Sequence, residues 1–179
     1  MPHNGVYAGN DSDGTPIYIG RAFHDGDETP AKLIPSKQAC YISHNGLEIF
    51  KPTFEALTGT GFTWVSSSNG HVPAGAVLAG NTVNGLPLYV GRAQHEGSLT
   101  PGKIHGAHGC IYIAYGGMEH SILHYEVLVG QQHQPPPHHP HLPPQHNIPP
   151  QHHQQRCKNK LFCHPVINAI LIQVTFFLF

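Results

Sequence analysis

Residues 80–93 read GNTVNGLPLYVGRA, and residues 9–22 read GNDSDGTPIYIGRA. The two stretches begin at positions 9 and 80, so the offset between them is 71 residues. The same offset relates His24 to His95, Thr29-Pro30 to Thr100-Pro101, Lys32 to Lys103, Tyr41-Ile42 to Tyr112-Ile113, and Glu48 to Glu119. This period exceeds the roughly 20–50 residues of solenoid repeats. We therefore expect two copies of one module, packed as a pseudo-twofold pair.

The repeated stretch alternates as a β-strand does. Leu88 and Val90 would point to one side of the strand, and Tyr89 and Gly91 to the other. Further strands are predicted at residues 17–20, 41–42, 64–65, 72–77, 111–113 and 125–129. Windows of about eleven residues show no apolar helical stripe free of Gly or Pro. The predicted fold class is all-β, with the two repeats forming a pseudo-twofold β-sheet or sandwich.

The duplication also sets the domain boundaries. The first repeat covers residues 1–58 and the second covers residues 61–130. The second begins with a strand at Trp64 and Val65, and counting back 71 residues from Trp64 falls before Met1. We therefore expect the first repeat to be incomplete at its front. Either it leaves a sheet edge open, or the sequence is a truncated or mispredicted version of the chain.

The composition changes abruptly after Gly130. Residues 131–155 are almost wholly Gln, His and Pro, which predicts an extended, solvated and disordered tail. Its imidazoles would bind Zn or Cu ions loosely, or the tail is an inert linker. Residues 156–179 are first basic and then apolar, and the apolar run at 166–179 is shorter than the roughly 20 residues of a membrane-spanning helix. A membrane-seeking segment and a non-native C-terminus both remain open.

The charge balance and the N-terminal sequence indicate which partners and which location to expect. Charged residues make up 11% of the 179 residues, and the formal net charge is −1 at pH 7. Phosphate binding needs clustered Lys and Arg, so we expect no nucleic-acid partner. The N-terminus has no basic start followed by an apolar run, which predicts no signal peptide and a cytoplasmic location. Association with vesicles or membranes is left open.

Common catalytic signatures are absent from the sequence. It contains no Gly-x-Ser-x-Gly, phosphate loop, HExxH or dinucleotide fingerprint, and no CxxC metal spacing. We expect a protein that is not an enzyme, that uses no cofactor, and that has no metal site in its repeats. Arg21 and Arg92 lie in apolar strands, where we expect them to bond buried carbonyls or a carboxylate such as Glu48 or Glu119.

Other polar residues suggest a binding site. Asp11 lies in a predicted loop and Lys32 follows a Thr-Pro turn, which places a carboxylate acceptor and an ammonium donor in one repeat. The adjacent hydroxyls of a sugar need both kinds of group. By itself, Asp11 is equally consistent with a turn former, and Lys32 with a solvated charge. His24 and His95 would be structural or would line the rim of a site.

An ordered set of motifs resembles the DM9 repeat. The set comprises Ala-Gly-Asn-Asp (8–11), Gly-x-Pro-Ile/Leu-Tyr-Ile/Val-Gly-Arg-Ala-x-x-His, Thr-Pro-x-Lys, Tyr-Gly-Gly-Met-Glu-His (115–120) and Tyr-Glu-Val-Leu-Val (125–129), within residues 5–130. The repeat occurs in tandem in insect DM9-domain proteins, in mannose-binding oyster lectins and at the front of natterin-like toxins. The resemblance implies a pseudo-symmetric all-β pair of repeats. For the lectins it also implies mannose recognition, by the Asp of an Ala-Gly-x-Asp loop and the Lys of Thr-Pro-Gly-Lys.

Carried onto this chain, the implied mannose ligands are Asp11 and Lys32. Thr82 stands in place of Asp11 in the second repeat, where Lys103 keeps its Thr-Pro-Gly-Lys context. In the first repeat, Ala31 replaces the Gly before Lys32. The resemblance therefore implies one carbohydrate site at Asp11 and Lys32, with Lys103 as a weaker candidate. The sequence leaves open whether the Asp of one repeat meets the Lys of its own repeat or of the other.

Two functions are consistent with these features. The leading one is a lectin-like protein that binds mannose-type glycans, for example in innate immune recognition of microbes, with weak sites combined in a homo-oligomer. The alternative is a non-catalytic intracellular interaction or scaffold protein whose His/Pro tail binds metal or acts as a linker.

Overall fold

The computed structural model describes residues 3–130 and, for residues 169–175, the backbone. These residues form an all-β fold, as predicted from the alternation in the repeats. The predicted tail at residues 131–155 lies outside the described residues. Within them, no helix has the length and apolar character needed to cross a membrane.

The two repeats form equivalent strands in the same order. The first repeat forms β1 (Tyr7–Asn10), β2 (Pro16–His24), β3 (Asp27–Ile34), β4 (Ala39–His44), β5 (Leu47–Phe50) and β6 (Thr53–Gly59). The second forms β8 (Leu78–Asn81), β9 (Pro87–His95), β10 (Ser98–His105), β11 (Cys110–Tyr115), β12 (Met118–Ile122) and β13 (His124–Gly130). The remaining elements are β7 (Phe62–Ser68), β14 (Ala169–Thr175) and two 3-10 turns, η1 (Pro35–Lys37) and η2 (Gly106–His108).

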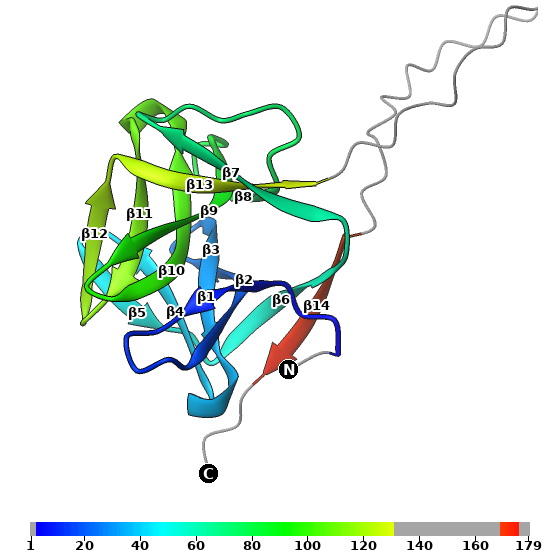
Figure 1. The fold of residues 1–179 in the computed structure, drawn as a ribbon. Coiled ribbons are helices and arrows are strands. Elements are labelled where there is room, and N and C mark those ends of the chain that lie inside the picture. The colour runs from blue at the N-terminus through cyan, green and yellow to red at the C-terminus, as the bar shows by residue number, and fades with distance from the viewer. Residues whose placement is uncertain (1–2, 131–168, 176–179) are drawn as a thin grey trace, which may run out of the picture. The chain divides into compact units, whose positions relative to one another are not determined.

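All strands belong to one antiparallel sheet. Its order is β14-β6-β2-β3-β4-β5-β12-β11-β10-β9-β13-β7, with β1 paired to β2 and β8 paired to β9. The repeats, coloured blue to cyan and green to yellow in Figure 1, join where β5 meets β12. There the N–H of Glu48 donates to the carbonyl of Gly117 at 3.1 Å, and the N–H of Glu119 donates to that of Gly46 at 3.0 Å. The 71-residue offset exchanges these two bonds, so the junction is pseudo-twofold.

The interior is partly shared between the repeats. One apolar cluster contains residues of both, namely Val6, Ala8, Ile17, Ile19, Ile34 and Leu57 from the first and Val77, Ala79, Val90 and Leu128 from the second. Each repeat also has a cluster of its own, around Leu33 and Ile42 or around Ile104 and Ile113. Because burial of apolar surface stabilises the fold, the shared cluster couples the folding of the two repeats.

The predicted strand alternation is confirmed. Ile17, Ile19, Leu88 and Val90 are each at most 1% exposed, whereas Tyr18 and Tyr89 are only partly buried. The strand predicted at residues 72–77 is wrong. Those residues form a turn, from which Ala76 makes an isolated bridge to Val129, and the next strand begins at Leu78. Pro73 and Gly75 favour turn geometry over a continuous ladder.

The backbones of the two repeats approach each other closely at two glycines. A Cβ atom at Gly9, in β1, would overlap the backbone oxygen of Leu99 in the second repeat. A Cβ atom at Gly80, in β8, would likewise overlap the backbone oxygen of Glu28 in the first. Glycine is therefore needed at both positions so that the backbones can come this close.

The outer strands β7 and β14 occupy equivalent places. In the second repeat β7 pairs with β13, with Phe62 opposite Gly130 and Ser68 opposite His124. In the first repeat β14 pairs with β6 in the same register, as Ala169 lies opposite Gly59. β14, from the apolar C-terminal run, thus occupies beside β6 the place that β7 occupies beside β13. The open sheet edge that was one of the two alternatives is covered by this pairing.

Candidate functional site

Lys32 lies in β3 and extends its ammonium group into the junction of the repeats. Its Nζ atom donates hydrogen bonds to Glu48 Oε1 and to the carbonyl oxygen of Ala114 in the other repeat, both at 2.7 Å. The second carboxylate oxygen of Glu48 accepts the N–H of Gly117 at 2.7 Å. Only 6% of the Lys32 side chain is exposed. This lysine therefore links the repeats in addition to being a predicted ligand.

Lys103 makes the matching set of contacts from β10. Its Nζ atom lies 3.0 Å from Glu119 Oε1 and donates to the carbonyl oxygen of Ser43 in the first repeat at 2.6 Å. Glu119 Oε2 accepts the N–H of Gly46 at 2.8 Å. Each position differs from its counterpart by 71 residues, so the two lysine sites are related by the pseudo-twofold axis.

Asp11 has a different charged partner. It lies in the loop after β1, and its Oδ2 atom is 2.9 Å from Lys37 Nζ, while Oδ1 accepts the N–H of Ser12 at 2.9 Å. The same ammonium group lies 2.7 Å from Asp13 and, chiefly through this hydrogen bond, holds the pKa of that carboxyl well below its usual range. Asp11, whose side chain is 15% exposed, therefore belongs to a cluster of charges with the exposed Lys37 and Asp13, whereas Lys32 is paired with Glu48 in the junction.

A pocket in the second repeat shows how the positions equivalent to Asp11 and Lys32 lie relative to each other. A pocket of about 240 Å³ is lined by Thr82, Leu88, Lys103, His105, His108, Tyr112 and Glu119 from the second repeat and by Asp27, His44 and Asn45 from the first. Thr82 and Lys103 are the counterparts of Asp11 and Lys32. The two positions therefore border the same pocket within one repeat, and the other repeat supplies part of the wall.

Aromatic rings accompany both lysines. Lys32 Nζ lies 5.4 Å from the ring centre of Tyr41 and 5.8 Å from that of Tyr115 in the other repeat. Lys103 Nζ lies 5.5 Å from the ring centre of Tyr112. Burial raises the pKa of Tyr112 to about 12, so its hydroxyl stays protonated at neutral pH. Each lysine therefore has a carboxylate and a tyrosine beside it, which together provide donors, acceptors and an apolar ring face.

The sequence reasoning missed two contributors to the first-repeat site, Lys37 and Glu48 as a lysine partner. Lys37 has His108 as its counterpart, so no repeated residue type marked it. The expectation that the arginines bond a carboxylate is confirmed, but Glu48 and Glu119, the examples named for it, are not their partners. The arginines instead bond Glu55, at 2.6 Å from Arg21, and Glu126, at 2.7 Å from Arg92.

The arginine interactions confirm the other half of that expectation, that these side chains bond carbonyl groups. Arg21 donates to the carbonyl oxygen of Ala79 at 3.3 Å, and Arg92 donates to that of Ala8 at 2.7 Å. Both bonds run from one repeat to the other. Arg21 and Arg92 therefore act in the fold, and their partners differ from those of the two lysines.

Fold and site together define a class of protein: an all-β tandem repeat with pseudo-twofold polar sites at the junction of its two copies. The model of the DM9 repeat family matches residues 11–122, and the chain belongs to this family. No match was found among curated proteins.

Proposed function

We propose that this DM9 protein is a non-enzymatic, lectin-like protein that binds mannose-type glycans. The observation that carries the proposal is the pair of polar sites at the repeat junction, where a lysine, a carboxylate and a tyrosine lie together. Neighbouring hydroxyl groups of a pyranose need both donors and acceptors, and an aromatic ring suits its C–H face. The family resemblance of residues 8–11 and of the Thr-Pro-x-Lys motif supports the choice of mannose. Thr29-Pro30 lies within β3 and not in the turn predicted from the sequence.

We place the stronger site in the first repeat, at Asp11 and Lys32. The charged acceptor at position 11 is a hydroxyl in the second repeat, at Thr82, and hydrogen bonds to charged groups are stronger than those between neutral groups. Lys37 adds a second ammonium group 2.9 Å from Asp11, whereas its counterpart is His108. The site at Thr82 and Lys103 is accordingly the weaker of the two.

The proposed biological role is recognition of glycans on microbes. A single monosaccharide site in a shallow polar pocket buries little surface and binds weakly. Presentation of several sites in a homo-oligomer would raise the effective affinity without any new contact. We expect binding to a mannose-coated surface to be much tighter than binding to free mannose.

Matched substitutions in the two repeats test the site assignment. Asp11→Asn keeps the size of the side chain and removes its charge, and we expect it to weaken mannose binding by about tenfold or more, since a charge-assisted bond contributes roughly 1.5–3 kcal/mol. Thr82→Val, at the counterpart position, should change the affinity for mannose by less than about twofold. Isothermal titration of the full chain with mannose, with galactose as the control sugar, measures both. Equal effects of the two substitutions would contradict the assignment.

The alternative, a scaffold or interaction protein, gives a different result in the same titration. A chain that remains folded but responds to neither sugar would leave the repeats as a scaffold. Attention would then move to partners of residues 131–155, which lie outside the described residues.

A further inference from the structure

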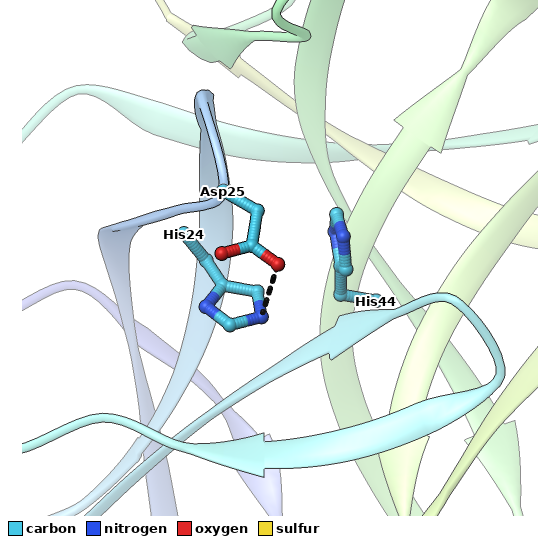
Figure 2. A group of neighbouring side chains, drawn as sticks. All are labelled: His24, Asp25 and His44. Atoms are coloured by element: carbon cyan, nitrogen blue, oxygen red, sulfur yellow. Dashed lines mark ion pairs between the residues drawn. The ribbon is translucent and has the colours of Figure 1, made fainter.

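A group of metal-ligating side chains contains neither Asp11 nor Lys32. His24 ends β2, Asp25 begins the following turn and His44 ends β4. One potential ligand atom from each of these residues lies within 4.8 Å of the other two. Figure 2 shows the three side chains converging, with the Asp25 carboxylate beside the rings.

One distance in this group is close to that between two ligands of a bound ion, and the others are at most 4.8 Å. Nε2 of His24 lies 3.6 Å from Oδ2 of Asp25. Ligand atoms about 2.1 Å from a tetrahedral zinc ion are themselves roughly 3.4 Å apart. The Asp25 side chain is 74% exposed on its turn, so its carboxylate can adjust its position toward a bound ion. The two histidines are 21% and 12% exposed and already hold their positions.

A further carboxylate supports His44. Oδ2 of Asp27 lies 3.6 Å from Nδ1 of His44, and Oδ1 accepts the N–H of Val83 at 2.7 Å. The Asp27 side chain is only 14% exposed, so its position is fixed. Carboxylates beside metal-bound histidines orient the ring and raise its basicity. Asp27 is placed for that role.

The ammonium group of Lys51 opposes the binding of a cation beside His24. Nζ of Lys51 lies 3.4 Å from Nδ1 of His24 and donates to it when His24 carries its proton on Nε2. A metal at Nε2 needs the other tautomer, so binding must displace the lysine. Removal of the Lys51 charge should therefore favour the metal.

The second repeat provides an internal comparison. The counterparts of the three residues are His95, Glu96 and Tyr115, so one imidazole is replaced by a phenol. The rings keep the same arrangement, as His95 and Tyr115 meet edge to face at 5.1 Å and 85°, and His24 and His44 at 4.8 Å and 86°. A tyrosine therefore fits in place of His44 without a change in ring packing.

From these observations we propose that His24, Asp25 and His44 form a site for a divalent transition-metal ion of the zinc type. Two neutral imidazoles and one carboxylate are a common ligand set for Zn²⁺, with water completing the coordination. The ion would tie the turn after β2 to the end of β4, and through His44 it would adjoin the pocket that Thr82 and Lys103 line. This metal site does not depend on the sugar proposal.

Residue-specific NMR separates this site from the many other histidines of the chain. The full chain, with ¹⁵N-labelled histidine, is titrated with Zn²⁺ at about pH 7.5, where imidazoles are mostly neutral. The ring nitrogens of His24 and His44 should shift together and saturate, while those of His95 should not shift. A folded protein in which the His24 ring does not respond to Zn²⁺ would overturn the proposal.

Substitutions give the second line of the test. His44→Tyr, which copies the second repeat, should weaken zinc binding at His24 by at least about tenfold. Asp25→Asn, on an exposed turn, should weaken it without disturbing the fold, and Lys51→Met should tighten it. A zinc response of His24 that is the same in His44→Tyr and Asp25→Asn as in the natural chain would show that the ion is held elsewhere.

Discussion

At the residue scale, a lysine and a glutamate recur as a buried ion pair in each repeat. The two side chains are 6% and 10% exposed at Lys32 and Glu48, and each 11% exposed at Lys103 and Glu119. Ions removed from water are tolerated when their remaining donors and acceptors are also satisfied. Here backbone groups of the opposite repeat provide these remaining hydrogen bonds. Each ion pair therefore links the two repeats.

Lys103→Met should therefore destabilise the protein strongly. The substitution keeps the aliphatic stem but leaves Glu119 and the carbonyl group of Ser43 without their cation, which we expect to lower the free energy of unfolding by about 3 kcal/mol. Lys37→Met is the control, because its side chain is 42% exposed and exposed pairs contribute little. Urea denaturation measures both. Similar losses for the two variants would contradict the structural role of Lys103.

A buried histidine predicts acid sensitivity. His105 stacks on His108 with ring centres 3.7 Å apart, and burial, together with the charges of His108 and Lys103, lowers the pKa of His105 despite the opposing charge of Asp27. The unfolded chain then binds a proton more readily than the folded one, so stability is lost as the pH falls below about 6.5. Ile34 is the counterpart of His105 in the first repeat.

We expect the free energy of unfolding to fall between about pH 7.5 and pH 5.5, and to fall less in His105→Ile. Denaturation at several pH values gives both slopes, and the histidines that do not contact His105 contribute equally to the two proteins. Identical slopes would show that His105 does not resist protonation in the folded state.

Residue roles could be predicted only in part from the sequence. The 71-residue offset identified Lys32, Lys103, Glu48 and Glu119 as a repeated set. The position of the arginines in apolar strands indicated that they bond carbonyls or a carboxylate. The offset did not give the pairing of lysine with glutamate, because these residues meet only after β3, β4 and β5 have paired. The cluster of His24 and His44 was missed for the same reason, as the two lie on separate strands.

At the scale of the elements, strand alternation predicted the central strands well. Ile17 and Ile19 are buried as expected, because strand periodicity is local and both repeats display it. The pairing of β14 with β6 could not be predicted, since the partner strand lies more than a hundred residues further along the chain. Such long-range pairing leaves no local pattern in the sequence.

Removal of β14 should affect one edge of the sheet. A chain that ends at residue 165 would leave the β6 groups facing β14 exposed to water, and we expect faster amide hydrogen exchange there. The β13 amides, which pair with β7, should keep their protection. A chain that ends at residue 175 retains the strand and is the control. Unchanged exchange in β6 after the larger deletion would contradict the pairing.

At the scale of the whole molecule, duplication accounts for both the fold and the sites. The repeats share an apolar cluster, and arginine and lysine side chains of each repeat bond backbone carbonyl groups of the other. Gly9 and Gly80 each lie against the backbone of the opposite repeat. The sequence predicted a pseudo-twofold pair but not that each polar site takes residues from both copies. That feature depends on the junction of β5 and β12, which the offset alone does not define.

We propose that the junction sites bind mannose, and this can be tested directly. The most direct measurement is an NMR titration of the full, ¹⁵N-labelled chain with mannose and, separately, with galactose. We predict saturable shifts with mannose that centre on the amides near Asp11 and Lys32, smaller shifts near Thr82 and Lys103, and little change with galactose. No shift near Asp11 and Lys32 in a folded protein at saturating mannose, or the same shifts with both sugars, would contradict the account.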